Sequence, residues 1–371
     1  MAEYTVTPWE VSGKIDYEKL VKEFGTKPLT DSLVKRIEKQ AGKSHLFLRR
    51  KIFFSHRDLD LVLDGFDKGQ KFALYTGRGP SGHTHIGHLV PWLFTKYLQD
   101  AFNVELYFQL TDDEKFFVKD LTPEQTRDFA YENALDIIAC GFDPKKTHIF
   151  LDTEYAKTLY GIASRVARKT TFSTARAVFG FSNETNLGLI FFPALQAAPC
   201  FLPSVLKGKN IPVLIPAAID QDPYWRGIAR EAAPKLGYPK PAQIHNTFLP
   251  GLGEGGKMSA SDPRTAIYTT DDEKAVDKKV GNAFTGGQPN VAMQREKGGN
   301  PDICPVMHYF HFLFEEDDKK VEEQIQLCRS GKLLCGEHKK MLAEKVNAFL
   351  KKHRQKREKA KKQIEKFMLR D

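Results

Sequence analysis

A strand, a glycine-rich turn and the start of a helix follow one another between Phe72 and Ala101, and similar units recur along the chain. Phe72 to Thr76 has the alternation typical of a strand, and Leu89 to Ala101 has one apolar face, as a helix does. Strands that alternate with helices predict an α/β fold, a Rossmann-like doubly wound parallel sheet with helices on both faces. The expected units are strands at 72–76, 104–110, 147–151, 212–216 and 243–249 and helices at 85–101, 123–140 and 222–236.

Three segments are expected along the chain. Residues 1–50 are interpreted as an N-terminal extension, with a hairpin from Trp9 to Tyr17 that turns at Ser12-Gly13-Lys14, followed by helices. Residues 51–261 should form the Rossmann-like domain, with a helical insert at about 153–203. Strand patterns then vanish, so residues 262–371 are predicted to form a helical domain that ends in a basic helix. Its expected helices are 271–280, 305–314, 317–330 and 337–369.

The turn after the first strand suits a phosphate. Backbone N–H groups at a helix N-terminus point, with the positive end of the helix dipole, at any anion bound there. Gly77, Gly79 and Gly82 also spell G-x-G-x-x-G, the dinucleotide-binding pattern. That reading is disfavoured, because no acidic residue stands about 20 positions further on to hold a ribose. The acids that follow the second strand are the cluster at 112–114.

Two short motifs narrow the chemistry. His85, Gly87 and His88 have the form H-x-G-H. About 0.02 matches to this pattern are expected by chance at this composition. Imidazole N–H groups beside a glycine suit a triphosphate held for reaction. The second motif is Lys257-Met258-Ser259-Ala260-Ser261, which follows a glycine-rich run at 251–256. Each motif occurs once, in the order and at the separation found in class I aminoacyl-tRNA synthetases.

With both motifs, the chain resembles the tryptophanyl-tRNA synthetases of eukaryotic and archaeal type within that class. The resemblance runs from Pro8-Trp9 to the last helix. One departure is Ala260, where many class I members carry a second lysine, so Lys257 is the only lysine of the loop. Further matching segments are 77–81, 111–115, 138–142, 192–199 and 218–224.

The resemblance implies a two-step reaction. The tryptophan carboxylate attacks the α-phosphate of ATP, which releases pyrophosphate and leaves tryptophanyl-adenylate, and the aminoacyl group then passes to the 3′ end of tRNA. Phosphoryl transfer depends on positioning and charge neutralisation, with Mg²⁺ expected as a counter-ion between phosphates and no metal-binding side chain predicted. The resemblance assigns catalysis to His85, His88, Lys257 and Ser259, and ATP binding to Arg78, Gly87, Met258 and Ser261.

The resemblance also implies a tryptophan pocket, in which the indole N–H needs an acceptor because it can only donate. It assigns Tyr75 and Gln109 to the indole, and Glu114, Gln196 and Gln221 to the ammonium and carboxylate. Gln196 stands out without any family, as the one strongly polar side chain in 187–203. An unpaired buried amide costs roughly 1–3 kcal/mol, so Gln196 should bind either a ligand or the backbone.

Two of these residues have an alternative interpretation. The acids at 112–114 could serve only to stabilise a helix N-terminus, which would leave Glu114 without a ligand role. Tyr75 could be an ordinary core tyrosine.

The composition of the chain limits the kinds of partner and compartment that we expect. The chain has 371 residues and a net charge of +9, and ten bases minus three acids give +7 of it between Lys351 and Asp371. This basic helix either contacts tRNA or is simply a solvated face. The five cysteines contain no C-x-x-C pair, so reduced thiols and no zinc site are expected. No leader sequence or long apolar run is seen, so a cytoplasmic protein without a membrane span is predicted.

Other functions stay open at this point. A tyrosyl-tRNA synthetase would share the fold and both motifs, but it needs an acidic side chain for a phenol hydroxyl where Gln109 stands. A nucleotidyltransferase also uses H-x-G-H, although it has no use for a basic helical domain. An oxidoreductase lacks its ribose acid here, and a non-catalytic RNA-binding protein would not need both motifs. A homodimer is expected because the resembling family pairs through its catalytic body, and the chain is too short for an editing domain.

Overall fold

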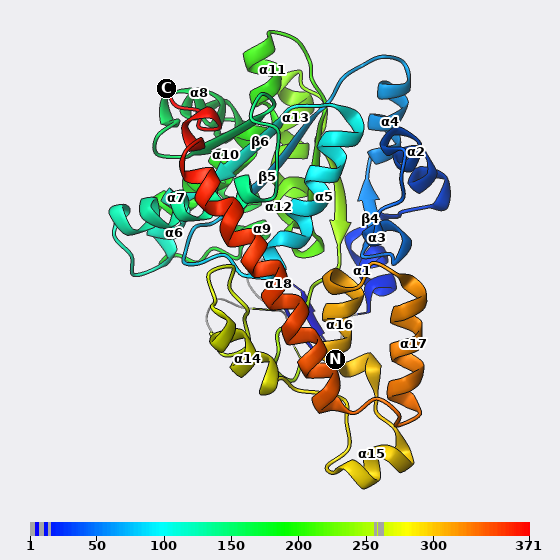
Figure 1. Cartoon of the computed structure of the whole chain (residues 1–371). Coiled ribbons are helices and arrows are strands. Elements are labelled where there is room, and N and C mark those ends of the chain that lie inside the picture. The colour runs from blue at the N-terminus through cyan, green and yellow to red at the C-terminus, as the bar shows by residue number, and fades with distance from the viewer. Residues whose placement is uncertain (1–3, 7–10, 14–15, 256–257, 259–262) are drawn as a thin grey trace.

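A seven-stranded sheet forms the centre of the molecule (Figure 1). The computed structural model describes residues 4–6, 11–13, 16–255, 258 and 263–371. The strand order is β3-β4-β9-β8-β5-β6-β7, and the five strands from β9 to β7 are parallel. The α/β prediction is therefore confirmed. The strands are β3 (Lys27–Pro28), β4 (Phe53–Arg57), β5 (Ala73–Arg78), β6 (Leu106–Leu110), β7 (Thr147–Leu151), β8 (Val213–Ala218) and β9 (Ala242–Asn246).

Two antiparallel strands at one edge were not expected from the sequence. β4 pairs antiparallel with β9, and β3 pairs antiparallel with β4. β4 lacks an apolar alternation because its buried positions include Ser55 and His56. Ser55 Oγ lies 3.0 Å from Nδ1 of His245 on β9, so a side-chain hydrogen bond replaces apolar packing there. A strand held in this way does not show the hydrophobic pattern that identifies strands.

The central strands separate two hydrophobic cores. Along β5, Leu74 packs into one core, whereas Ala73 and Tyr75 pack into the other. β6 behaves in the same way, with Phe108 on the first side and Tyr107 on the second. Successive side chains of a strand point to opposite faces, so a sheet with helices on both sides buries every position.

Most helices lie where the sequence predicts them. The segment 153–203 is helical as expected, and the helix predicted at 222–236 is present but interrupted by a π-helical turn, η3. The short helix α6 was not predicted. In the region up to β9 the helices are α1 (Tyr17–Phe24), α2 (Asp31–Ala41), α3 (Leu46–Arg49), α4 (Leu59–Asp67), α5 (Ile86–Phe102), α6 (Asp112–Val118), α7 (Pro123–Ala139), α8 (Ala156–Ala167), α9 (Phe172–Phe179), α10 (Leu187–Ala197), η1 (Ala198–Cys200), α11 (Leu202–Lys207), η2 (Ile219–Gln221), α12 (Asp222–Tyr224), η3 (Trp225–Ala229) and α13 (Arg230–Leu236).

A hairpin lies near the N-terminus, but the predicted bounds, Trp9 to Tyr17, and the predicted turn are wrong. β1 (Tyr4–Val6) pairs antiparallel with β2 (Val11–Gly13). Ser12 and Gly13 therefore belong to the second strand, and the connection between the strands falls at 7–10, outside the described residues. Ser-Gly is a common turn dipeptide, and here the strand pairing outweighs that local preference.

After β9, every regular element of the described chain is helical. These elements are α14 (Glu273–Gly281), α15 (Val291–Lys297), η4 (Pro301–Ile303), α16 (Pro305–Tyr309), η5 (Phe310–Phe314), α17 (Asp318–Arg329), α18 (Cys335–Lys361) and η6 (Ile364–Lys366). The predicted continuous helix 337–369 is wrong beyond Lys361. Ile149 of β7 donates its N–H to the carbonyl of Phe367 and accepts from the N–H of Leu369, so the chain end runs extended beside the sheet.

The helix α18 returns from the helical region and lies along α7 (Figure 1). At this contact His353 Nε2 lies 2.9 Å from Asp136 Oδ1, and Arg357 pairs with both Asp136 and Glu132. Burial alone would raise the pKa of Asp136, but the hydrogen bond from His353 and the charge of Arg357 hold it below its ordinary value. One base of the predicted basic helix, Arg357, thus has a structural role.

Asp136→Asn is expected to destabilise the protein by roughly 3 kcal/mol at pH 7, because it breaks a buried ion pair. A depressed folded-state pKa means that the carboxylate stabilises the fold above about pH 4 and that this contribution is lost as pH falls further. Denaturant unfolding at pH 7 and pH 3.5 checks both statements. Glu358→Gln is the matched control, since Glu358 pairs with Lys361 on the exposed side of α18 and should change stability little. An equal effect of the two variants would contradict the prediction.

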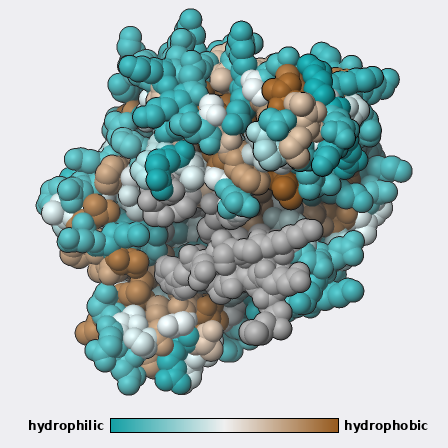
Figure 2. Space-filling view, turned by 90° about the horizontal axis from the view of Figure 1, so that it is seen from below, coloured by the Kyte–Doolittle hydropathy of each residue, from teal (hydrophilic) through white to brown (hydrophobic). Residues whose placement is uncertain are grey.

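The surface of the described part has no large apolar face in the view from below, where Figure 2 shows mostly hydrophilic side chains and a few hydrophobic groups. Among the described helices, none is long and apolar enough to cross a membrane.

Candidate active site

A cavity of about 450 Å³ lies at the carboxyl ends of β5, β6, β8 and β9. This is the edge of a parallel α/β sheet at which ligands bind. All of the predicted site residues that the structure describes line it, and Lys257, Ser259 and Ser261 lie outside the described residues. The predicted residues in its wall are Tyr75, Arg78, His85, Gly87, His88, Gln109, Glu114, Gln196, Gln221 and Met258.

The H-x-G-H motif forms the start of α5 at one end of the cavity. The backbone N–H of His85 donates to Nδ1 of His88 over 3.2 Å, and the two imidazole rings stack with their centroids 3.5 Å apart. The N–H of Ile86 donates to the carbonyl of Ile267, and His85 forms an isolated bridge with Tyr268. The segment that follows the second motif therefore lies against the first motif, although the two are far apart in the sequence.

Gly87 leaves no room for a side chain. A Cβ built at this position would lie 3.1 Å from Nδ1 of His85, 3.2 Å from its Cε1 and 3.7 Å from Cβ of Met258. The glycine thus lets the imidazole of His85 and the second motif approach the helix start together.

Gly87→Ala should lower the rate of substrate activation about tenfold, because the added methyl group displaces the His85 ring from its position at the cavity. Steady-state kinetics of the first half-reaction would measure this. The change should leave the thermal midpoint within a few degrees of the parent. Unchanged kinetics would show that the position of His85 does not matter to the reaction.

Arg78, the last residue of β5, presents a buried cation to the same end of the cavity. Its Nε donates to Oδ1 of Asn133 over 3.2 Å, while Nδ2 of Asn133 donates to the carbonyl of Gly82 over 2.9 Å. Burial lowers the pKa of Arg78 to about 10, opposed by the charges of Glu114 and Asp136, so the side chain stays charged at pH 7. Within the described chain, its buried Nη2 has no hydrogen-bond partner. Such a group suits an anionic ligand.

Another part of the cavity wall carries aromatic side chains and one polar relay. The hydroxyl of Tyr75 lies 2.5 Å from Oε1 of Gln109 and 3.1 Å from the carbonyl oxygen of Gln196. Burial raises the pKa of Tyr75 well above its ordinary value, so the hydroxyl remains a donor. Nε2 of Gln109 donates to Asp152, at 2.8 Å from Oδ1 and 3.0 Å from Oδ2. Phe192, Tyr224 and Trp225 also line the cavity.

Both interpretations of Tyr75 and of Glu114 describe part of what the structure shows. Tyr75 is buried in a hydrophobic core and also lines the cavity. Glu114 lies in the first turn of α6, where it accepts a hydrogen bond from Thr111 and pairs with Lys115 at 2.7 Å, and it lines the cavity as well.

The sequence left open whether the Gln196 amide binds a ligand or the backbone. Its buried Oε1 has no hydrogen-bond partner among the described residues. This oxygen therefore does not accept a structural hydrogen bond from the backbone there. Gln221, on η2 after β8, also lines the cavity.

Sequence reasoning missed two residues that hold the site residues in place. Asp152 directly follows β7, and its position at the carboxyl end of a parallel strand was a usable signal. Asn133 lies in the middle of α7 and is fully buried. A polar residue without exposure inside a helix needs a partner, but the sequence does not say that the partner is Arg78.

Comparisons with known proteins agree with this geometry. A family described as tRNA synthetases class I (W and Y) matches residues 67–351. A tryptophan–tRNA ligase of Pyrobaculum calidifontis is 54% identical over 368 residues, which cover 99% of this chain and 98% of that protein. One from Thermococcus sibiricus is 55% identical over 371 residues, or 99% of this chain and 94% of that protein. The tryptophanyl-tRNA synthetase from Giardia lamblia superposes with a TM-score of 0.89 at 39% identity and 96% coverage of both chains. The chain therefore belongs to the family of class I tRNA synthetases for tryptophan (W) and tyrosine (Y).

Proposed function

We propose that this chain is a tryptophan–tRNA ligase, which activates L-tryptophan with ATP and transfers it to the 3′ end of tRNA. The observation that carries the choice of amino acid is the fixed acceptor in the apolar end of the cavity, Oε1 of Gln109 beside the Tyr75 hydroxyl. A carbonyl oxygen has two lone pairs, so Oε1 can accept from Tyr75 and from an indole N–H together. The full-length relatives named as tryptophan–tRNA ligases support the same choice.

Activation needs no general base, because the tryptophan carboxylate is already a nucleophile. The protein has to place that carboxylate in line with the α-phosphate and neutralise the charge on the pyrophosphate that leaves. We assign phosphate contacts to the start of α5, with His85, Gly87 and His88, and to the guanidinium of Arg78. Lys257, Ser259, Ser261 and Met258 of the second motif complete this assignment. Glu114, Gln196 and Gln221 are assigned to the amino and carboxyl groups of tryptophan.

ATP is the nucleotide substrate in this proposal, and Mg²⁺ is its counter-ion. Across the described residues, no three His, Cys, Asp or Glu side chains are arranged to hold a metal ion. Mg²⁺ is often held by substrate phosphates and water, so the cation would arrive with ATP.

The pocket should discriminate strongly between amino acids. Tyrosine would bring a smaller ring and a phenol hydroxyl that both donates and accepts, whereas the indole N–H only donates to the Gln109 oxygen. Phenylalanine would bring no N–H to the buried Gln109 oxygen and would leave part of the pocket volume unfilled. A mismatch of this type lets an enzyme reject the wrong amino acid strongly without editing.

Amino-acid-dependent exchange of labelled pyrophosphate into ATP tests the proposal without tRNA. Exchange with tryptophan, and with neither tyrosine nor phenylalanine, is expected. Exchange with tyrosine alone would overturn the amino-acid assignment but keep the reaction. No exchange with any amino acid by a folded preparation would overturn the enzymatic proposal.

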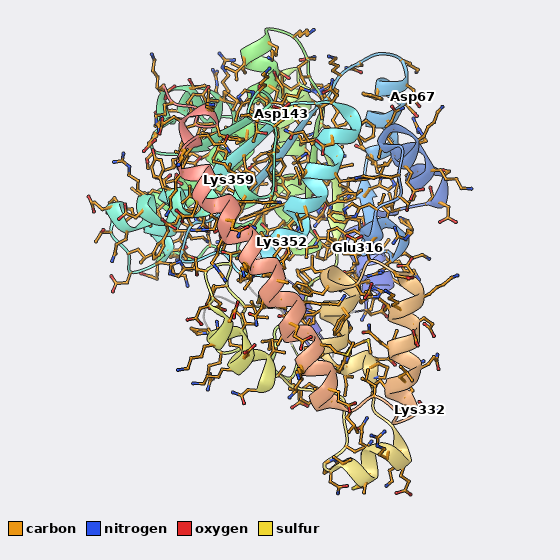
Figure 3. The ribbon with its side chains drawn as sticks, in the orientation of Figure 1. Asp67, Asp143, Glu316, Lys332, Lys352 and Lys359 are labelled. Atoms are coloured by element: carbon orange, nitrogen blue, oxygen red, sulfur yellow. The ribbon has the colours of Figure 1, made fainter. Side chains whose placement is uncertain are left out.

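The tRNA partner is proposed to contact the exposed face of α18. Lys352, Lys356 and Lys359 are four and three residues apart, so they share a face of the helix, and all three are exposed. Lys352 and Lys359 are labelled along this helix in Figure 3. Among the described residues, no ion pair occupies any of these lysines. Free cations in a row suit a phosphate backbone.

Changing Lys352, Lys356 and Lys359 to glutamate together should reduce aminoacylation of tRNA about tenfold at roughly 0.1 M salt, with pyrophosphate exchange unchanged. The same change at Lys35, Lys39 and Lys68, exposed on α2 and beside α4, is the control for net charge. If both triple variants lose aminoacylation equally, the effect is one of net charge and α18 has no special role.

We also propose a homodimer. Several large apolar side chains are exposed on helices that pack around α10, and a second copy would cover them. Equilibrium sedimentation should give twice the chain mass at micromolar concentration, and a monomer would contradict the proposal. The side chains are Phe116, Val118, Tyr160, Phe172 and Leu187, with Leu187 83% exposed. Because translation uses charged tRNA in the cytoplasm, we place the enzyme there, which cell fractionation would test.

A further inference from the structure

A buried carboxyl group lies behind the indole end of the cavity and has no part in the reaction described above. Asp152, the residue directly after β7, is 3% exposed, and it does not line the cavity. Its partner Gln109 lies on β6, and the partner of Gln109, Tyr75, lies on β5. These three strands are neighbours, so the relay crosses the sheet from its edge to the cavity.

The contact between Asp152 and Gln109 admits one orientation of the amide. Both carboxyl oxygens of Asp152 lie within 3.0 Å of Nε2 of Gln109, where an N–H donor satisfies them. An amide rotated by 180° would bring Oε1 against these oxygens and would turn Nε2 towards Tyr75 and the cavity. The cavity would then present a donor to the indole N–H, which is itself only a donor.

We propose that Asp152 is a positioning residue for tryptophan selection, which holds the Gln109 amide so that its oxygen faces the Tyr75 hydroxyl and the indole N–H. This inference rests on the proposed function, since it concerns how the same pocket recognises its substrate. Asp152 does not touch the substrate, and its effect passes through Gln109 alone.

The neighbouring acids keep Asp152 in the accepting role. Burial, then the charge of Asp113, raises the pKa of Asp152 well above its ordinary value, and burial raises the pKa of Asp113 to about 6. Their side chains are hydrogen-bonded to each other, so a proton that the pair shares lies between the two carboxyl groups. That proton is thus directed away from Gln109, and the oxygens of Asp152 remain available to Nε2. Asp112 is occupied elsewhere, by the N–H and hydroxyl of Thr153.

The test compares tryptophan with β-(benzo[b]thiophen-3-yl)-L-alanine, in which sulfur replaces the indole N–H. The measured quantity is the ratio of kcat/KM for the two amino acids in pyrophosphate exchange. Asp152→Ala should reduce this ratio roughly tenfold, because the amide loses its preferred orientation and only tryptophan depends on the oxygen. Asp152→Asn should keep the ratio within about threefold of the parent, since its Oδ1 can accept from Gln109 while Nδ2 donates to Asp113.

Thr153→Val is the matched control, because it disturbs the same acidic cluster one residue further on without touching Gln109. It should lower both kcat/KM values equally, if at all. The proposal is overturned if Asp152→Ala also affects both amino acids equally, which is the result of a purely structural role. It is likewise overturned if Asp152→Asn loses as much selectivity as Asp152→Ala.

A double-mutant cycle separates this inference from the proposed function. In a Gln109→Leu background, adding Asp152→Ala should leave the ratio unchanged, because there is no amide left to orient. Failure of the parent protein to use tryptophan would refute the proposed function. A selective parent whose ratio survives Asp152→Ala would refute only the role of Asp152.

Discussion

Arg78→Ala is expected to lower tryptophan-dependent pyrophosphate exchange by roughly 100-fold to 1000-fold, as the loss of one preorganised charge partner for a transition state does. The guanidinium is buried in the cavity wall, and its Nη2 lacks a partner in the described chain. A buried cation gains most from an anion that arrives with the substrate, since little of the interaction is screened by water. The loss should appear in kcat and in the KM for ATP, with the tryptophan dissociation constant within about threefold of the parent.

Two further variants make this expectation specific. Arg78→Lys keeps a charge but cannot hold Asn133 and a phosphate in the same fork, so it should recover only part of the rate. Asn133→Ala removes the partner of Arg78 Nε and of the Gly82 carbonyl, and should raise the KM for ATP without abolishing exchange. Calorimetric titration with tryptophan supplies the second readout. If Arg78→Ala weakened tryptophan binding as much as it slowed exchange, Arg78 would be a structural residue and not a phosphate ligand.

The parallel part of the sheet could be predicted from the sequence because its strands are buried on both faces. β7 has its predicted bounds, and β5 and β6 differ from prediction by two residues or fewer at either end. Such strands consist of apolar runs, and the helices between them carry an apolar face, so the pattern appears directly in the residues.

Elements that polar contacts hold could not be predicted in this way. β4 is fixed partly by Ser55 with His245, and the end of α18 by backbone pairing of the residues around Met368 with β7. The predicted turn of the first hairpin is wrong for a similar reason. A Ser-Gly pair favours a turn, but here Ser12 and Gly13 pair with β1. For β4 and for the chain end the deciding partner lies far away in the sequence, and local preference is a weak guide there.

The residues of the candidate site likewise fall into those that the sequence identified and those that it missed. The residues that line the cavity follow strands or motifs, and the sequence identified them through their chemistry and through a resemblance. The residues behind them, Asp152 and Asn133, contact the site only through other side chains, Asp152 through Gln109 and Asn133 through Arg78. Nothing in a single sequence reveals such a pairing, since it depends on the register between β6, β7 and α7.

Gln109→Leu is expected to reduce kcat/KM for tryptophan by roughly 10-fold to 100-fold. The leucine is close to glutamine in size, so the apolar pocket stays filled, but three polar groups lose their contact with the amide: the indole N–H, the Tyr75 hydroxyl, which keeps the carbonyl oxygen of Gln196, and the Asp152 carboxyl. Each unsatisfied buried group costs about 1–3 kcal/mol, and the first of these costs is felt only when tryptophan is bound. The thiophene analogue, which has no N–H, should lose much less.

The comparison also separates recognition from folding. Tyr107→Phe is the control on the same strand, because the Tyr107 hydroxyl bonds to Glu105 and Tyr107 does not line the cavity. It should leave both amino acids with their parent kinetics. If Gln109→Leu slowed tryptophan and the analogue to the same extent while Tyr107→Phe slowed neither, Gln109 would support the strand end without reading the indole. A loss confined to tryptophan would instead mean that one amide oxygen, held in place from behind, decides which amino acid this enzyme activates.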